Sequence, residues 1–361
     1  MKFIQNSGYH FVELYVGMAK MVAWWHQEVL GFEIAGKRER KGLHGMEVSY
    51  WLRNGNANLI ITSALDPSAQ DVVSFVDRHG NSIKRFGVLV ENIENALEFL
   101  QEKKAIFLNG KIESESSGGE QTRLIRCKLF DDNEVVFVEK QRMHGPLPGF
   151  EPTALQNKTP DGLVTNIDHL ASVVCVNESD FWKDYLSQIM RLDHVQTIGE
   201  EFFQSLSSGM KMHALFSPTI HLNKVIVEPL MDKPKSSQVD VFLQHNLGTG
   251  IQHIAFEVED LISVVREYRK RGIQFTPIPE RYYENLRVEF PDLPIDLMKE
   301  NQILCEKDND KILLQIFTEP LGDRPTLFYE FVQRVNDYNG FGADNVRQLF
   351  KSLEVQLDGE S

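Results

Sequence analysis

Alternation of apolar and polar residues predicts a strand followed by an amphipathic helix at two distant places in the chain. The first is 8–33, "GYHFVELYVGMAKMVAWWHQEVLGFE", and the second is 166–193, "NIDHLASVVCVNESDFWKDYLSQIMRLD". Each opens with a short alternating apolar run and continues into a helix rich in Trp or Phe. The likeness indicates that the second half of the chain repeats the first.

Two further pairs of segments support this duplication. The segment 86–108, "FGVLVENIENALEFLQEKKAIFL", resembles 254–276, "IAFEVEDLISVVREYRKRGIQFT", and both predict a strand, an acidic turn and a helix. The segments 123–141 and 302–320 then match as strand hairpins. We therefore predict an α+β fold in which duplicated βαβββ modules form two open, barrel-like β-domains.

A Pro- and Gly-rich stretch divides the chain near its middle. We predict an N-terminal domain at 1–145, a connector at 146–163 and a C-terminal domain at 164–361. Near the C-terminus, Val346, Leu349, Phe350 and Leu353 have the spacing of an amphipathic helix. Gly340 and Gly342 precede it and can absorb changes of backbone angle. We expect this helix to gate the functional site.

Charge and cysteine content exclude several classes of function. The formal net charge of -14 argues against general binding of nucleic acid or anionic membranes, which requires basic surface. No apolar run approaches the roughly 20 residues that span a bilayer. The three cysteines, Cys127, Cys175 and Cys305, are far apart, so a disulfide framework or thiolate zinc site is not expected. We predict a cytoplasmic protein.

Duplication supplies an internal control for candidate metal ligands. In the second half, three such residues fall at the starts or ends of predicted strands: His169, His253 and Glu330. In the first half, the corresponding positions are expected to be His10, Arg85 and Glu139. Because arginine does not bind metals, only the second half is predicted to hold one. The alternative is that all six are incidental polar residues of strands.

Two imidazoles and one carboxylate on one face leave coordination positions of a metal open. This is the ligand set of non-haem Fe(II) oxygenases, in which a 2-oxo acid and O2 can share the metal. Zinc or manganese would use similar ligands, so the residues alone do not choose the metal.

Longer motifs carry a family resemblance. "NIDHL", "GIQHIAF", "LPGFEP", "LLQIFTEPLGDRPTLFYEFVQR" and "GFGADNVRQLF" resemble the 4-hydroxyphenylpyruvate dioxygenase and hydroxymandelate synthase family of the vicinal oxygen chelate superfamily. The resemblance implies two vicinal oxygen chelate domains and Fe(II) held by His169, His253 and Glu330. It also implies three active-site glutamines, Gln238, Gln252 and Gln315, and three pocket phenylalanines, Phe317, Phe328 and Phe341. Gln238 has the alternative of a surface amide at a strand end. Gln252, next to His253, is expected to point the other way along its strand.

The chain departs from this family at the end of the pocket away from the metal. The family usually has "P-x-N-E-P" where the chain has "VIVEP", so Val225 and Val227 replace a proline and an asparagine. Met212 aligns with a family serine, and Val346 with a pocket phenylalanine. An apolar pocket has no partner for a buried phenol, which would therefore lose hydrogen bonds there. The departures favour a less polar substrate.

The resemblance implies an Fe(II)-dependent dioxygenase that oxidatively decarboxylates an aryl 2-oxo acid with O2. The leading expectation is conversion of 4-hydroxyphenylpyruvate to homogentisate. The alternatives are benzylic hydroxylation of the hydroxymandelate synthase type, a less polar 2-oxo acid, or a non-enzymatic small-molecule binder on the same fold. We also expect a homo-oligomer.

Overall fold

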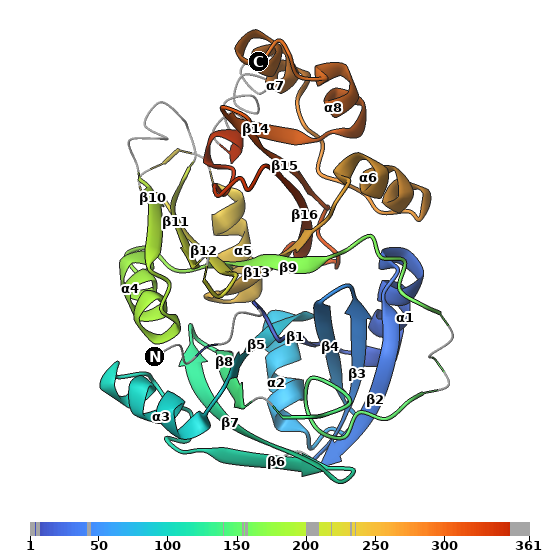
Figure 1. Cartoon of the computed structure of the whole chain (residues 1–361), viewed down its shortest axis with the longest axis vertical. Coiled ribbons are helices and arrows are strands. Elements are labelled where there is room, and N and C mark those ends of the chain that lie inside the picture. Colours follow the sequence, from blue (N-terminus) through green and yellow to red (C-terminus); the bar gives the residue numbers. More distant parts are fainter. Residues whose placement is uncertain are drawn as a thin grey trace.

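The computed structural model describes residues 4, 8–41, 45–139, 141–153, 155, 158–199, 209–217, 219–231, 233–234 and 236–346. Its strands form two eight-stranded sheets, one in each half of the chain. Figure 1 shows the sheet of the first half, in blue to green, below that of the second half, in green to red.

The elements of the first half follow the predicted order of strands and helices. They are β1 (Phe11–Tyr15), α1 (Ala19–Leu30), β2 (Glu33–Lys41), β3 (Met46–Asn54), β4 (Ala57–Ala64), α2 (Gln70–His79), β5 (Ser82–Val90), α3 (Ile93–Glu102), β6 (Glu113–Ser117), β7 (Glu120–Leu129) and β8 (Asn133–Glu139).

The second half repeats this series and adds two short helices. Its elements are β9 (Asn166–Val173), α4 (Ser179–Met190), β10 (His194–Ile198), β11 (Met210–Ser217), β12 (Leu222–Pro229), α5 (Gln238–Asn246), β13 (Gly250–Glu257), α6 (Leu261–Lys270), α7 (Glu280–Glu289), α8 (Ile295–Asn301), β14 (Leu304–Asp308), β15 (Lys311–Phe317) and β16 (Phe328–Val335).

The two sheets have the same strand order. It is β2-β3-β4-β1-β5-β8-β7-β6 in the first half and β10-β11-β12-β9-β13-β16-β15-β14 in the second. In each sheet two βαβββ modules meet at a central antiparallel pair, β1 with β5 or β9 with β13. The prediction of a duplicated, barrel-like α+β fold is confirmed. The first sheet ends at Glu139 and the second begins at Asn166, while the exact domain boundaries stay a prediction.

Local signals explain why corresponding helices form in both halves. Asn92 caps α3 by accepting a hydrogen bond from the Asn95 amide, and Asp260 caps α6 through the Ser263 amide. Both caps lie in the acidic turns recognised in the sequence. The first helix of each half, α1 or α4, ends at a residue in the left-handed region, Gly31 or Arg191.

One continuous apolar core joins the halves. Phe32, just after α1, packs edge-to-face on Phe256 of β13, with ring centroids 5.8 Å apart. His26 of α1 meets the Tyr329 hydroxyl of β16 at 2.6 Å. The two sheets are therefore packed against each other rather than strung on a linker.

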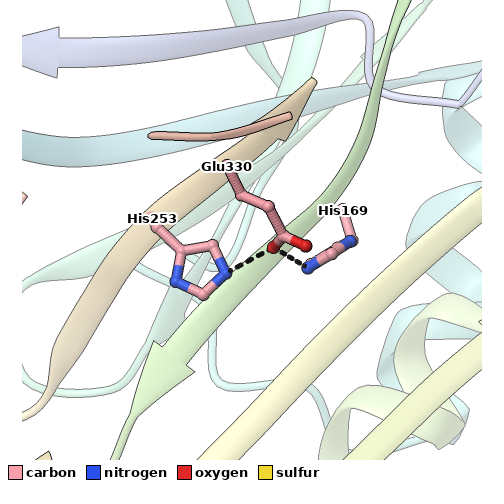
Figure 2. Close-up of side chains that lie close together, drawn as sticks. All are labelled: His169, His253 and Glu330. Atoms are coloured by element: carbon pink, nitrogen blue, oxygen red, sulfur yellow. Dashed lines mark ion pairs between the residues drawn. The ribbon is translucent and has the colours of Figure 1, made fainter. Parts of the chain in front are cut away.

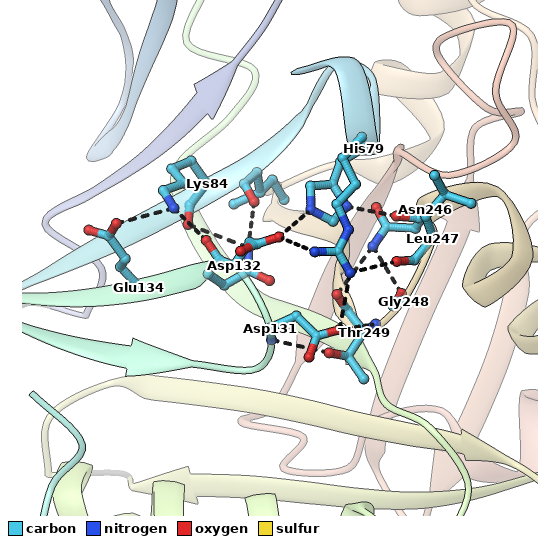
Figure 3. A network of polar contacts seen from close by, with 12 residues as sticks. His79, Lys84, Asp131, Asp132, Glu134, Asn246, Leu247, Gly248 and Thr249 are labelled. Carbon is cyan, nitrogen blue, oxygen red and sulfur yellow. Dashed lines mark hydrogen bonds and ion pairs between the residues drawn. The ribbon is translucent and has the colours of Figure 1, made fainter. Parts of the chain in front are cut away.

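A polar network closes a second part of this interface (Figure 3). The ring of His79, at the end of α2, lies 2.7 Å from the Asn246 carbonyl and 3.0 Å from the Asp132 carboxylate. The Asp131 amide donates to the Thr249 hydroxyl, and the Thr249 amide donates to the Asp131 carboxylate. These contacts fix the turn that leads into β13, the strand of His253.

The predicted C-terminal helix lies mostly outside the described residues. One helical turn is present at 343–346, where the Val346 amide donates to the Gly342 carbonyl. Leu349, Phe350 and Leu353 lie outside the described residues, so gating stays a prediction. Among the helices that are described, none has the length and apolar character needed to cross a membrane.

Candidate metal centre

Three adjacent strands of the second sheet bring His169, His253 and Glu330 together. Ala255 of β13 is the register partner of His169 on β9 and of Glu330 on β16, so both side chains flank one point of the central strand. One ligand atom from each residue of the triad lies within 4.8 Å of the others, and all three residues are buried. The structure therefore brings the three candidate ligands together, and their role as metal ligands stays a prediction.

The arrangement around Glu330 suits a bound cation (Figure 2). Glu330 Oε2 lies 3.2 Å from Nε2 of His169 and 3.2 Å from Nε2 of His253. His169 Nδ1 lies 2.7 Å from Asp168 Oδ1, which fixes its proton on Nδ1. The Nε2 atoms of both imidazoles and the Glu330 oxygen thus converge on one point. A divalent metal there would displace the proton from His169 Nε2 and take its place beside the carboxylate, so the donor set fits such an ion.

The electrostatics of the triad point the same way. Burial acts to lower the pKa of His169, but the Glu330 carboxylate and the Asp168 hydrogen bond raise it to about 9. Burial acts to raise the pKa of Glu330, but the two imidazoles lower it to about 2. Burial lowers the pKa of His253. The site therefore holds an ionised carboxylate that attracts positive charge.

Asp168 and Arg334 hold His169 in place through its Nδ1 atom, and the sequence analysis predicted neither residue. Arg334 donates to the two oxygens of Asp168 at 2.6 and 2.9 Å, a bidentate pair. Although burial opposes ionisation, this guanidinium lowers the pKa of Asp168. The signal was present, since Asp168 directly precedes His169 and Arg334 lies on the Glu330 strand. A carboxylate that orients a metal-binding histidine is a common arrangement.

The three glutamines occupy different environments. Gln315 of β15 is buried, and its Nε2 donates to Glu330 Oε1 at 2.8 Å. Gln252 is buried at a β-bulge of β13, so the strict alternation behind the expected opposite orientation of Gln252 and His253 does not hold there. Gln238 is exposed on the first turn of α5, after the Ser237 cap. Its placement matches a surface amide, at a helix start rather than a strand end.

The predicted pocket residues gather beside the triad. Met212, Val225, Val227 and Phe341 belong to one buried apolar cluster, against which the partly buried Val346 packs. Met212 and Val227 are direct cross-strand partners on β11 and β12, so the two departures from the family pattern form one apolar surface.

Aromatic rings enclose the two histidines. Phe328 stacks on His253 with centroids 4.7 Å apart, and Phe317 meets the same ring edge-on at 6.2 Å. Phe341 lies edge-on to His169 at 5.8 Å. The centre is therefore bordered by apolar groups that restrict water.

Strand register corrects the expected N-terminal counterparts of the triad. Gly87 of β5 pairs with Phe11 and Val136, as Ala255 pairs with His169 and Glu330. The counterparts of His169 and Glu330 are therefore Phe11 and Val136, and the expected assignments to His10 and Glu139 are wrong. His10 instead corresponds to Asp168, one position earlier. Arg85 is the counterpart of His253, as expected, because Arg85 and His253 pair with Glu13 and Ala171 respectively.

The interior of the first half is ionic where the second half has its triad. Phe11, Arg85 and Val136 all line one cavity of about 150 Å³. Arg85 Nε lies 2.6 Å from Glu13, and its Nη1 lies 3.6 Å from Glu134. Two of the three equivalent positions are thus apolar, and the third carries a guanidinium already paired with carboxylates.

Comparisons with known proteins agree with the predicted resemblance. The model of the Glyoxalase/Bleomycin resistance protein/Dioxygenase superfamily matches residues 82–316. The 4-hydroxyphenylpyruvate dioxygenase of Danio rerio is 29% identical over 366 residues, covering 97% of this chain and 90% of the relative. A putative protein of Caenorhabditis elegans is 30% identical over 371 residues, covering 98% and 97%.

A solved structure is similar over the full length. A triple mutant of 4-hydroxymandelate synthase from Streptomyces coelicolor superposes with a TM-score of 0.81 at 26% identity, covering 98% of this chain and all of that one. The chain therefore belongs to the Glyoxalase/Bleomycin resistance protein/Dioxygenase superfamily, as an enzyme related to 4-hydroxyphenylpyruvate dioxygenase and 4-hydroxymandelate synthase.

Proposed function

We propose that this protein is an Fe(II)-dependent dioxygenase that oxidatively decarboxylates an aryl 2-oxo acid. The observation that carries the proposal is the buried His169, His253 and Glu330 centre, in a chain whose named relatives are dioxygenases. Fe(II) held by these residues would supply open positions for the carboxylate and keto oxygens of a 2-oxo acid and for O2.

The residues around the centre prepare it for that metal. Asp168 keeps the His169 proton on Nδ1, so that Nε2 is free to bind. Arg334 keeps Asp168 ionised, and Gln315 occupies one oxygen of Glu330. The rings of Phe328 and Phe341 lie against the two histidines and limit the access of water to them.

The leading substrate is 4-hydroxyphenylpyruvate, with homogentisate as the product, because that keto acid names the enzyme relatives. The adjoining apolar cluster has the character expected for an aryl side chain. A second candidate is benzylic hydroxylation of the same keto acid, favoured by the full-length likeness to a hydroxymandelate synthase.

A third candidate is a keto acid without the phenol. The buried pair of Met212 and Val227 offers no hydrogen bond at the position where family members carry polar residues. A pocket that hydrogen-bonds a phenol can discriminate strongly against the analogue that lacks it, whereas an apolar surface cannot. On this argument the protein accepts phenylpyruvate at least as well as 4-hydroxyphenylpyruvate.

The test is O2 uptake by the Fe(II)-loaded protein with a panel of aryl and aliphatic 2-oxo acids. We expect uptake that depends on both Fe(II) and an aryl 2-oxo acid, with release of one CO2 per O2. Homogentisate and 4-hydroxymandelate are isomers, so chromatography and fragmentation, rather than mass alone, must separate ring from benzylic oxidation. Tight keto-acid binding without uptake would instead support the non-enzymatic binder.

A further inference from the structure

We infer that Asn345 is a positioning residue that, through Gln315, fixes which carboxylate oxygen of Glu330 faces the metal. The inference rests on the proposed function, because it assigns this residue a role toward the bound metal. A buried chain of hydrogen bonds carries the effect from the backbone of Cys305 through Tyr282 to the metal centre.

Four successive hydrogen bonds make up this chain, and each is 2.8 Å long. The Cys305 amide donates to the Tyr282 hydroxyl, which donates to Asn345 Oδ1. Asn345 Nδ2 donates to Gln315 Oε1, and Gln315 Nε2 donates to Glu330 Oε1. All four side chains are at most 3% exposed, so water does not compete for these bonds.

The direction of the bonds matters because an amide has a donor end and an acceptor end. The Tyr282 oxygen accepts a hydrogen bond from the Cys305 amide. The Tyr282 hydroxyl donates to Asn345 Oδ1 at 2.8 Å, which is nearer than the Cys305 carbonyl. This contact turns the Asn345 amide so that its nitrogen faces Gln315. The Gln315 amide is in turn held with its nitrogen, not its oxygen, toward Glu330.

The last bond selects the oxygen of Glu330 that is left for the metal. Oε1 accepts from Gln315, while Oε2 lies 3.2 Å from Nε2 of both His169 and His253. Glu330 is therefore arranged to bind through Oε2 alone. A one-oxygen ligand keeps an additional coordination position free for the 2-oxo acid and O2.

An independent observation shows that the turn before Asn345 is built against the same amide. Gly342 has a φ of +73°, and a Cβ there would lie 2.0 Å from Gln315 Oε1. Only glycine allows the backbone to pass this close to the Gln315 side chain. The "GFG" motif thus has a role beyond a flexible turn, because it admits Asn345 to the hydrogen-bond chain.

The test uses Co(II) as a spectroscopic substitute for Fe(II) in the full-length protein. In Asn345→Asp the introduced carboxylate can only accept, so Gln315 must turn its nitrogen toward it and its oxygen toward Glu330. We expect Co(II) affinity, measured by chelator competition, to fall about 10- to 100-fold. The visible Co(II) spectrum should also change as the coordination of Glu330 changes.

Two variants separate this effect from a loss of folding. Asn345→Ala removes the donor without adding charge. Tyr282→Phe removes the hydroxyl that orients Asn345, and with it the acceptor of the Cys305 amide. Both variants should weaken Co(II) binding by about 10-fold and alter its spectrum. Asn301→Asp is the matched control, because Asn301 is an equally buried amide of α8 that bonds the Leu297 carbonyl instead. It should change the unfolding midpoint but neither Co(II) affinity nor the spectrum.

The outcomes distinguish this inference from the proposed function. Wild-type affinity and spectrum in Asn345→Ala and Tyr282→Phe would overturn the role of Asn345 and leave the proposed function standing. Absence of Co(II) and Fe(II) binding by the wild type would overturn the proposed function, and this inference with it.

Discussion

The two half-barrels share strand order and register but fill the same three positions with opposite chemistry. The second half has His169, His253 and Glu330, whereas the first has Phe11, Arg85 and Val136. In the second half, the neighbouring interior is an apolar cluster around a candidate metal centre. In the first half, charged side chains pair with each other around a small cavity.

The contrast shows two ways in which the same fold stabilises the charge of a buried carboxylate. Glu330 is compensated by two imidazoles and, on our account, by a metal, and this leaves coordination positions for chemistry. Glu13 is compensated by the Arg85 guanidinium and the Thr62 hydroxyl, which leaves it closed to ligands. A buried carboxylate therefore indicates a functional site only when the group that compensates its charge can also bind a ligand, as a metal can and the Arg85 guanidinium cannot.

The largest expected effect comes from removing one member of the triad. His169→Ala should lower Fe(II) affinity by at least about 100-fold and abolish turnover, because one of three metal ligands is lost. The apo protein should keep its fold. Isothermal titration with Fe(II) under anaerobic conditions checks the first expectation and circular dichroism the second. Turnover within a few-fold of wild type would remove His169 from the metal centre.

The counterpart change in the first half should affect stability instead. Arg85→Met leaves the buried Glu13 carboxylate without its cation and Glu134 with Lys84 alone, so we expect a loss of about 3–5 kcal/mol in the free energy of unfolding. Metal affinity per folded chain should not change. Urea titration gives the first quantity and iron analysis the second.

A surface pair provides the control for Arg85→Met. Arg53 pairs with Glu33 at 2.9 Å, and its side chain is 47% exposed. Arg53→Met should therefore cost less than about 1 kcal/mol. Equal losses in the two variants would show that the ionic interior of the first half contributes no special stability.

Buried histidines of the two halves also differ in charge. Burial lowers the pKa of His26 from 6.5 to about 4, whereas carboxylates raise that of His169. Between pH 4 and pH 6.5, the unfolded chain binds a proton at His26 that the folded chain does not. The free energy of unfolding therefore falls as pH decreases from 6.5 toward 4. The full loss from this residue is about 3 kcal/mol.

The measurement is urea unfolding at pH 7.5 and pH 5.0 for wild type and His26→Gln. The variant should be less stable at pH 7.5, because it changes the contact with Tyr329, but it should lose less than the wild type on acidification. The same pH dependence in both proteins would assign the acid sensitivity to other groups.

The smallest expected effect concerns the apolar interior of the second half. Val227→Asn should shift the ratio of kcat/KM for phenylpyruvate and 4-hydroxyphenylpyruvate about 10-fold toward the phenol, the worth of one hydrogen bond. Steady-state O2 uptake with both substrates measures it. A wild type that strongly favours the phenol, together with an unchanged ratio in the variant, would show that Val227 does not set specificity.

Much of the fold could be predicted from the sequence, because the duplication repeats local signals. Asn92 and Asp260 cap equivalent helices, and alternating runs mark equivalent strands. The triad was also accessible, since His169 and His253 lie in strands with recognisable motifs. The likeness of the two apolar runs predicts His10 as the counterpart of His169, one position from the counterpart that strand register gives, Phe11.

The rest could not be predicted because register and long-range contacts decide it. The bulge that leaves Gln252 unpaired does not show in the apolar pattern. Asn345 reaches Gln315 across 30 positions, and Tyr282 reaches Asn345 across 63. Such hydrogen bonds depend on how strands, helices and turns come together, which neither spacing nor propensity encodes.

Fe(II) stoichiometry tests the central claim, that only the second half-barrel holds a catalytic metal. Anaerobic Fe(II) titration of the apo protein, followed by O2 uptake with an aryl 2-oxo acid, should give one iron per chain and uptake in proportion to bound iron. Both should disappear in His169→Ala and persist in Arg85→Met. Two irons per chain, or bound iron and uptake that survive His169→Ala, would contradict the account.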